Sequence, residues 1–213
     1  MTILRIDAWQ VRPGSQAEVV EFATRMKAQI ERCGGKSPRL MRVIVGGPST
    51  GLTYGEFQAA TLEEHGRIIG KLTDDDVMQQ LSRFYRSDGP VIAHEAAQAE
   101  VIAELGKRTA SIPGCVEIIQ NFKIANDRIG DYLELAGELA AITDGYDARL
   151  RVLHGLTGSV TGQIGQVVEF ADMAAFGRYA ADVWPQPAFQ DLVGKVRSVA
   201  RHLDGSLHAE VAT

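Results

Sequence analysis

The sequence has little of what would tie it to several large classes of protein. Only two of its 213 residues are cysteine, Cys33 and Cys115, which is too few for a disulfide framework. No stretch of 18 apolar residues is present, so we expect no segment to span a membrane. The first residues also lack the apolar core of a signal peptide. Together these absences favour a soluble, reduced, cytoplasmic protein.

Basic residues are scarce relative to acidic ones. The chain has 22 lysine and arginine residues against 27 aspartate and glutamate residues, which gives a formal net charge of −5. Proteins that bind nucleic acid use a basic surface to neutralise phosphate groups. We therefore expect no nucleic-acid partner.

The common catalytic and metal-binding motifs are missing as well. The sequence contains no H-x-x-x-H, C-x-x-C, H-E-x-x-H or G-x-S-x-G pattern. The acidic run Asp74–Asp76 falls at a predicted helix start, where capping and the helix dipole favour carboxylates. The glycine-rich segment 155–165 precedes a strand, so it lacks the helix N-terminus that binds phosphate. The sequence thus predicts neither a metal nor a cofactor.

An internal repeat is the clearest positive feature of the chain. Segments 50–67 and 161–178 both begin with Thr-Gly and end with Gly-Arg, 111 positions apart. Shorter matches follow in the same order: 39–43 with 148–152, 87–91 with 203–207, and 99–101 with 209–211. Their common order and near-constant offset favour a duplication, and repeats of this kind define architecture. We expect one unit in residues 1–105 and a second in 106–213.

Each half shows the same order of predicted elements. Hydrophobic alternation and turn residues predict eight strands, at 3–11, 39–46, 53–59, 90–102, 115–124, 149–156, 165–171 and 206–212. Apolar spacing and capping residues predict helices that begin at Ser15, after Thr61, after Asn126 or Asp127, and after Asp172, the last being broken at 184–187. The resulting order, β-α-β-β-α-β, is that of the ferredoxin-like unit.

Several of the predicted strands are apolar at odd and even positions alike. Examples are 41–45, 116–122 and 165–170. Strands that are buried on both faces have this pattern. The helices of a ferredoxin-like unit cover one face of its sheet, and a second copy of the sheet would cover the other. We therefore predict an α+β fold in which two antiparallel sheets pack face to face as an α/β barrel.

Two segments carry a resemblance to a known superfamily. RIDAWQVRPGSQAEVVEF (5–22) and VWPQPAFQDLV (183–193) are similar to the first strand with its helix start, and to the break after the second helix, of the dimeric α/β-barrel superfamily. This superfamily includes NIPSNAP-type and antibiotic-biosynthesis-monooxygenase-like proteins. Two chains usually supply its two sheets, whereas one chain would supply both here. The resemblance implies a fold shared by oxygenases, haem-degrading enzymes and isomerases.

Haem-degrading members of that superfamily use an asparagine, a tryptophan and a histidine around the porphyrin. Only Asn121, Trp9 or Trp184, and His154 could form such a set here. Their spacing does not reproduce the pattern, so the resemblance implies no haem site.

Candidate site residues follow from alternation in the first strand. Arg5, Asp7 and Trp9 share one face, and small aliphatic residues alternate with them on the other. Because helix packing favours aliphatic side chains, we expect the Arg5 face to point into the barrel. Arg5 and Asp7 would then either pair at the barrel mouth or contact a ligand. Trp9 offers a ring on which a ligand can stack.

His154 is the candidate from the second half. It shares a strand face with Leu150 and Val152, where a neutral histidine serves as a base or a cofactor ligand, or forms a structural hydrogen bond in the core or at the strand end. The other four histidines are expected in final strands (His94 and His208), in a solvated helical turn (His65) and near a helix C-terminus (His202).

Three functions remain open from the sequence. The first is binding of a small apolar or aromatic molecule between the two sheets. The second is a cofactor-independent monooxygenase or isomerase, in which His154 deprotonates an activated carbon acid while Asp7 or Arg5 stabilises the charge. The third is an assembly module with a filled barrel. A homodimer is expected through a surface other than the barrel interior, because sheet edges remain exposed.

Overall fold

The computed structural model describes residues 2–73 and 76–213, so Asp74 and Asp75 of the acidic run lie outside the described residues. The strands are β1 (Thr2–Val11), β2 (Lys36–Val45), β3 (Thr53–Ala59), β4 (Val91–Leu105), β5 (Val116–Ile124), β6 (Arg149–Thr157), β7 (Ile164–Phe170) and β8 (Ala200–Glu210). The helices are α1 (Gln16–Cys33), α2 (Leu62–Thr73), α3 (Asp76–Phe84), α4 (Ile129–Thr143), α5 (Met173–Val183) and α6 (Pro187–Val199).

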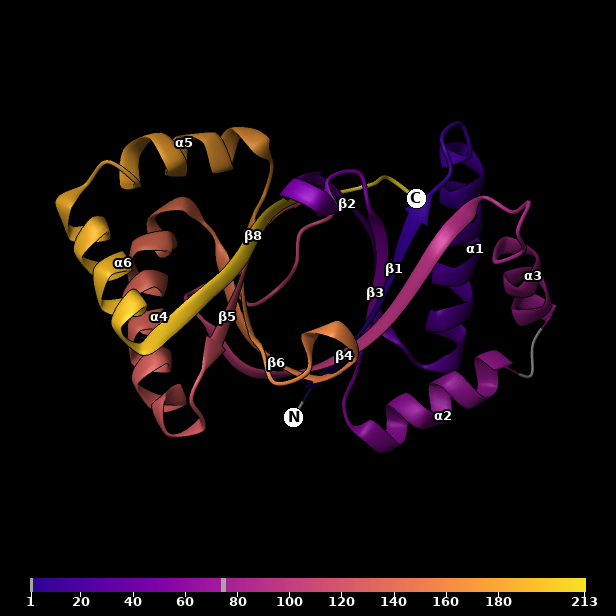
Figure 1. Ribbon diagram of the computed structural model, residues 1–213, viewed down its shortest axis with the longest axis horizontal. Coiled ribbons are helices and arrows are strands. Elements are labelled where there is room, and N and C mark those ends of the chain that lie inside the picture. The colour runs from indigo at the N-terminus through magenta and orange to yellow at the C-terminus, as the bar shows by residue number, and fades with distance from the viewer. Residues whose placement is uncertain (1, 74–75) are drawn as a thin grey trace.

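The eight strands close into one antiparallel barrel in the order β1-β3-β2-β8-β5-β7-β6-β4 (Figure 1). Within each half the strands lie in the ferredoxin-like order, fourth, first, third, second. The halves are joined at both edges, where β2 pairs with β8 and β4 pairs with β6. The predicted α+β fold of two ferredoxin-like units is confirmed, and the two sheets are hydrogen-bonded into a single ring. The division at residues 105 and 106 stays a prediction.

The helices cover the outside of the barrel. Helices α1, α2 and α3 lie against the first half, and α4, α5 and α6 lie against the second (Figure 1). The largest apolar cluster joins α4, α5 and α6 to the outer face of the second half. Smaller clusters join α1 and α2 to the first half. Strands covered by helices outside and by the opposite wall inside are buried on both faces, which explains their continuous apolar runs.

The duplication is visible in the second hairpin of each half. Gly51 and Gly162 occupy equivalent turns, with φ of 87° and 70°, each after a short 3-10 turn. The Gly51 amide donates to the carbonyl of Val43, and the Gly162 amide donates to that of Gly155. Both positions need the left-handed backbone that glycine adopts without strain. The predicted equivalence of Thr50-Gly51 and Thr161-Gly162 is confirmed.

Beyond that hairpin the predicted register of the repeat is wrong. Strand β8 begins at Ala200, directly after α6, six residues earlier than expected. Trp9 of β1 pairs with His94 of β4, and Phe122 of β5 pairs with His202 of β8. His94 and His202 are therefore counterparts, and His202 is a strand residue. The sequence matches in this region placed a turn of the first half opposite a strand of the second.

Local capping was predicted with mixed success. Asp172 accepts a hydrogen bond from the amide of Ala175 at 2.7 Å and begins α5 as expected. Thr61 accepts from the amide of Glu64 at 3.0 Å at the start of α2. Ser15 lies at the start of α1 but forms no side-chain cap.

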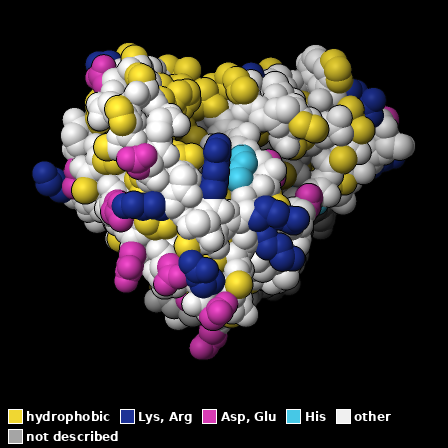
Figure 2. Space-filling model, turned by 60° about the vertical axis from the view of Figure 1, so that its left-hand side comes forward, with side chains coloured by type: hydrophobic (Ala, Val, Ile, Leu, Met, Phe, Trp, Pro, Cys, Tyr) yellow, Lys and Arg dark blue, Asp and Glu magenta, His cyan; other side chains and the backbone are white. Residues whose placement is uncertain are grey.

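The surface mixes charges of both signs. Figure 2 shows acidic and basic side chains interspersed below a depression that apolar side chains border at the top of the view. Among the helices that the structure describes, none combines the length and apolar character needed to cross a membrane.

Candidate functional site

Arg5, Asp7 and Trp9 do share one face of β1, but that face points outward. They line a pocket between the barrel wall and helices α1, α2 and α3, while Leu4 and Ile6 line the barrel interior. The expectation that Arg5, Asp7 and Trp9 face the interior is wrong. The aliphatic side chains instead pack inside the barrel against β6 and β7. The long polar side chains occupy the floor of the pocket between β1 and the helices.

An ion-paired array forms at the floor of this pocket. Arg5 donates two hydrogen bonds to Asp7, at 2.9 and 2.8 Å. Nε2 of His94, on the neighbouring strand β4, lies 3.0 Å from Oδ1 of Asp7. An ionised carboxylate only accepts, so His94 donates through Nε2 and its Nδ1 is the nitrogen that can take up a proton. A carboxylate that orients a histidine in this way is the arrangement used in general-base catalysis.

The electrostatics of the array keep Asp7 ionised. Burial raises the pKa of the Asp7 carboxyl, but hydrogen bonds from His94 and Arg5 outweigh it and lower the pKa below its ordinary value. The hydrogen bond to Asp7 raises the pKa of Arg5. The array therefore holds a negative charge and a positive charge beside an imidazole.

Two aromatic side chains form the wall beside His94. The indole Nε1 of Trp9 donates to the hydroxyl of Tyr85 at 2.9 Å, and the ring of Tyr85 lies 4.7 Å from that of His94. Burial raises the pKa of Tyr85 to about 12, so its hydroxyl keeps a proton that it can donate to a ligand oxygen. A Cβ at Gly55 would lie 2.9 Å from the indole ring, so glycine is required there for Trp9 to lie flat on β3.

The rest of the pocket is mostly apolar, although Lys27, Arg39, Glu56 and Thr73 also line it. Its volume is about 200 Å³, and the helices contribute Phe22, Met26, Leu72 and Leu81 to its walls. An apolar cavity with a few convergent polar groups is the usual form of a small-molecule site. This pocket is our candidate functional site.

The predicted site residues are only partly brought together. Arg5, Asp7 and Trp9 line the pocket, whereas His154 lies on the outer face of β6 in the other half, half-buried between Glu100 of β4 and Ile164 of β7. The expectation that His154 joins the other three is wrong, because its strand face looks toward α4. Whether any of the four acts in binding or catalysis stays a prediction.

Sequence reasoning missed His94 and Tyr85 as site residues. Their place depends on the pairing of β1 with β4 and on the turn after α3, which no local pattern records. His65 was also misjudged. It is buried rather than solvated, with its ring stacked 5.8 Å from Phe57. The helical spacing that places it on the same face as Ile68 and Leu72 was the available signal.

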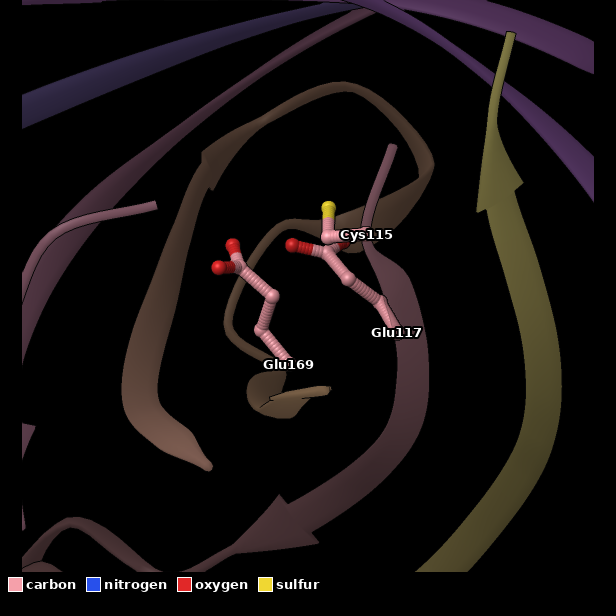
Figure 3. Close-up of side chains that lie close together, drawn as sticks. All are labelled: Cys115, Glu117 and Glu169. Atoms are coloured by element: carbon pink, nitrogen blue, oxygen red, sulfur yellow. The ribbon is translucent and has the colours of Figure 1, made fainter. Parts of the chain in front are cut away.

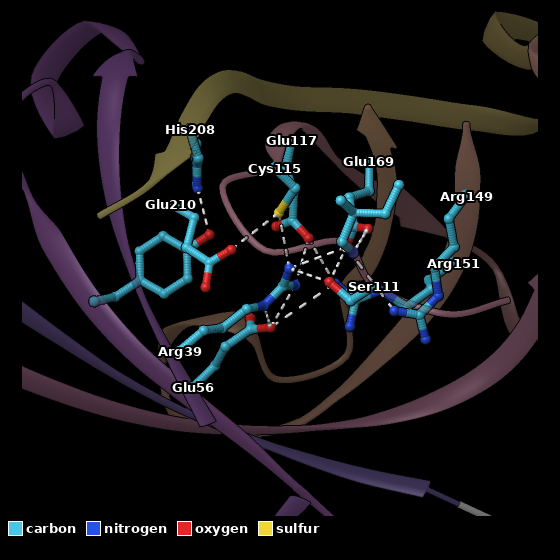
Figure 4. Close-up of polar contacts among 12 residues, drawn as sticks. Arg39, Glu56, Ser111, Cys115, Glu117, Arg149, Arg151, Glu169, His208 and Glu210 are labelled. Carbon is cyan, nitrogen blue, oxygen red and sulfur yellow. Dashed lines mark hydrogen bonds and ion pairs between the residues drawn. The ribbon is translucent and has the colours of Figure 1, made fainter. Parts of the chain in front are cut away.

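A second polar cluster lies inside the barrel (Figure 4). Arg39 of β2 donates to three buried carboxylates, those of Glu56, Glu117 and Glu169. Arg151 of β6 also donates to Glu117, at 2.8 Å. Burial raises the pKa of Glu117, but the two arginines outweigh it and lower the pKa to about 2. Ion pairs this deeply buried hold their partners in fixed geometry.

Glu169 ties this cluster to the segment between the two halves. Its carboxylate accepts from Arg39 at 3.0 Å, from Arg108 at 2.9 Å, from the hydroxyl of Ser111 at 2.8 Å and from the amide of Ile112 at 3.2 Å. Three of these donors belong to the connection from β4 to β5. The cluster therefore closes one end of the barrel with charge.

Cys115, Glu117 and Glu169 lie close enough together to suggest a metal site (Figure 3). The guanidinium of Arg39 already lies among them, 3.1 Å from the sulfur of Cys115 and 3.0 Å from Glu169. Burial raises the pKa of the Cys115 thiol to about 12, so it stays protonated. An arginine in the position of the cation does not fit a metal ion there.

The remaining interior is a hollow of about 320 Å³. His208 lines this hollow and contacts the hydroxyl of Tyr54 at 2.6 Å and that of Ser206 at 2.5 Å. Burial lowers the pKa of His208 to about 4. The hollow argues against a completely filled barrel. Its histidine is engaged on both ring nitrogens, whereas Oε2 of Glu117 and two guanidinium nitrogens of Arg151 lie buried without a hydrogen-bond partner among the described residues.

Comparisons with known proteins define the fold. No family model matches the chain, and no curated protein matches its sequence. An anthrone oxidase-like protein is similar with a TM-score of 0.66 at 15% identity, covering 99% of this chain and 92% of that one. A monooxygenase-like protein from Listeria innocua gives 0.52 at 7% identity, covering 100% and 95%. A ferredoxin-fold protein related to antibiotic biosynthesis monooxygenases, from Listeria monocytogenes 4b F2365, gives 0.50 at 5%, covering 100% and 97%.

These similarities span the whole chain, both halves included. The chain thus has the ferredoxin-like α/β-barrel fold. Proteins described as monooxygenase-like share this fold, and it is the fold that the sequence resemblance implied.

Proposed function

We propose that the pocket beside β1 binds a small aromatic molecule that carries an acidic C–H or O–H group. We further propose that it promotes the reaction of this molecule with dioxygen, as a cofactor-independent monooxygenase. The observation that carries the proposal is the Arg5–Asp7–His94 array, which lies within an apolar pocket and beside two aromatic rings. The monooxygenase-like and anthrone oxidase-like names of the structural neighbours support the same class of reaction.

The chemistry follows from the positions of the polar groups. Nδ1 of His94 takes a proton from the substrate, and Asp7 stabilises the imidazolium that forms. The hydroxyl of Tyr85 donates to the substrate oxygen as negative charge develops there, and Arg5 adds a fixed positive charge. The electron-rich carbanion or phenolate then reduces dioxygen. For a methylene carbon the overall change is R₂CH₂ + O₂ → R₂C=O + H₂O, which balances without another reductant.

The outer pocket suits this role better than the barrel interior. Inside the barrel, Arg39, Arg151 and the glutamates neutralise one another, and His208 has a pKa of about 4. An imidazole that stays neutral and hydrogen-bonded on both nitrogens is a poor base. The side chain of His94 is 29% exposed, and among the described residues it is hydrogen-bonded through Nε2 alone.

The test compares His94 with His154, the histidine that the sequence predicts as the base. We expect His94→Gln to lower the rate of oxygen uptake with anthrone by about 10²–10⁴-fold, the usual contribution of a general base. Asp7→Asn should lower kcat with little change in KM, because it disturbs proton transfer more than binding. His154→Gln, in the other half, is the matched control and should leave the rate unchanged. Oxygen consumption and the absorbance of the ketone product give the rates.

Two results would contradict the proposal. One is equal rates for wild type and His94→Gln at saturating substrate. The other is loss of activity in His154→Gln with His94→Gln active, which would restore the role first expected for His154. Binding of anthrone without oxygen uptake in any variant would reduce the proposal to ligand binding.

A further inference from the structure

The second half contains a pocket at the position equivalent to the candidate site. The pairing of β1 with β3 and of β5 with β7 makes Ile118, Gln120 and Phe122 the counterparts of Arg5, Asp7 and Trp9. The two histidines correspond as well, since each pairs with the aromatic residue of its neighbouring strand. All four second-half residues, His202 included, line one pocket of about 320 Å³ under α4, α5 and α6.

In both pockets the histidine contacts a side chain of the neighbouring strand, but in the second pocket that side chain carries no charge. Nε2 of His202 lies 2.6 Å from Oε1 of Gln120, as Nε2 of His94 lies 3.0 Å from the carboxylate of Asp7. An amide oxygen accepts the N–H but carries no negative charge to stabilise an imidazolium. Ile118 also removes the positive charge that Arg5 supplies. Among the described residues that line this pocket, only Arg197 is permanently charged, and it is exposed.

The pocket is otherwise built for an aromatic ligand. Its lining includes four aromatic side chains, Phe122, Tyr179, Trp184 and Phe189. Burial raises the pKa of Tyr179 to about 12, so this group stays neutral. A Cβ at Gly205 would lie 2.5 Å from the amide nitrogen of Gln120, so glycine lets the amide lie across β8. The amide nitrogen then offers a donor beside an aromatic wall.

We propose that this pocket is a second ligand site, which binds an uncharged aromatic molecule bearing a hydroxyl or carbonyl group and does not deprotonate it. The two pockets of the duplicated fold would thus have diverged, one toward proton transfer and the other toward neutral binding. This proposal stands apart from the oxygenase chemistry, because it needs only the residues of the second half.

The chain offers a separate reporter for each pocket. Its only two tryptophans are Trp9, in the first pocket, and Trp184, in the second. In a Trp9→Phe variant, all tryptophan emission comes from Trp184. We expect 4-nitrophenol, which is yellow only as the phenolate, to quench that emission saturably. The bound probe should stay colourless in the second pocket.

Two substitutions locate the binding. Val196→Phe places a larger side chain in the pocket wall. It should lower the affinity for 4-nitrophenol, measured by the quenching of Trp184, by about tenfold or more. Gln120→Met keeps the length of the side chain but removes its hydrogen bonds. It should lower the affinity for 4-nitrophenol by about three- to tenfold. The affinity for nitrobenzene, which has no hydroxyl, should stay nearly unchanged.

The first pocket provides the control. In a Trp184→Phe variant, emission reports Trp9 and should be insensitive to Val196→Phe. If circular dichroism shows that Trp9→Phe does not fold, equilibrium dialysis of the protein with both tryptophans replaces the fluorescence assay. Val196→Phe should then lower the amount of 4-nitrophenol bound by one molecule per chain.

Three results would overturn the proposal: linear rather than saturable quenching of Trp184, binding that Val196→Phe leaves unchanged, or a yellow bound probe whose colour is lost in Val196→Phe. The last would mean that Arg197 or a protonated His202 selects an anion. Because each pocket has its own tryptophan, failure here is distinguishable from failure of the proposed oxygenase site.

Discussion

Side chains decide which surfaces of the barrel can do chemistry. The shared face of Arg5, Asp7 and Trp9 could be predicted from alternation alone, because a strand has a strict period of two. The direction of that face could not, because both faces of β1 are buried, and the rule that aliphatic residues face helices fails here. His94 enters the site through the pairing of β1 with β4, so it could be found only from the fold.

Buried titratable groups also make stability depend on pH. Burial lowers the pKa of His208 to about 4 from an ordinary value of 6.5. The unfolded chain therefore binds a proton that the folded chain resists, and stability is lost as pH falls from 6.5 toward 4. The shift corresponds to about 3 kcal/mol at the acid end. We expect His208→Gln to flatten the dependence of the unfolding free energy on pH in this window, measured by urea denaturation.

His154→Gln is the control for that experiment, since His154 is a half-buried strand histidine outside the barrel interior. The comparison separates the loss of a buried interior histidine from the loss of a histidine elsewhere in the strands. If the unfolding free energy of His208→Gln changes with pH between 6.5 and 4 as steeply as that of wild type, His208 is not held neutral. Below this window, a second loss is expected from Glu117, whose pKa of about 2 lies under its ordinary value of 4.5. Its stabilisation is present above pH 4.5 and fades as pH falls toward 2.

At the scale of elements, the sequence predicts strands and hairpins better than it predicts the joins between elements. Strand β3 has the predicted bounds, 53–59, because turn residues flank it on both sides. Strand β8 was placed six residues too late, since "ARHLDG" is polar and follows α6 without a glycine or proline. Its outward side chains are solvated, so hydropathy gives no signal there.

The connection from β4 to β5 is an element without regular structure, and Glu169 fixes it. We expect Glu169→Gln to destabilise the fold by about 3–5 kcal/mol, because it removes the carboxylate that pairs with the buried guanidinium of Arg108 and one of the three that pair with Arg39. The exposed pair of Glu138 and Lys195, at 2.9 Å, is the matched control. Glu138→Gln should cost about 0–1 kcal/mol. If urea denaturation gives the same loss of unfolding free energy for both variants, burial does not explain the contribution of the Glu169 cluster to stability.

At the scale of the molecule, duplication closes a sheet that one unit would leave open. The repeat, the apolar strands and the expected barrel were all derivable from the sequence, because each depends on patterns that run through whole elements. What could not be derived was the divergence of the two outer pockets, because it depends on which residues face each other across four strands. The expected homodimer also remains a prediction, to be tested by light scattering against the chain mass of 23.1 kDa.

A chain that ends at residue 105 tests this view of the whole fold. Such a chain keeps β1, β2, β3 and β4 but loses β8 and β6, the partners of its two edge strands. It would also expose the inner apolar face that includes Leu4, Met41 and Ala99. Open edges and exposed apolar faces promote association, so we expect dimers or aggregates. A dimer could close a barrel by pairing β2 of one copy with β4 of the other.

Light scattering combined with urea denaturation distinguishes the outcomes. A truncated chain that is monomeric and unfolds cooperatively would show that the inner face does not need its cover. Addition of a separate 106–213 chain provides the positive control. It should restore a one-to-one complex, because it supplies the missing edges β8 and β6 and the carboxylates of Glu117 and Glu169, which pair with Arg39. The same complex formed with Arg39→Leu should be weaker, since two buried glutamates would then lose a shared cation.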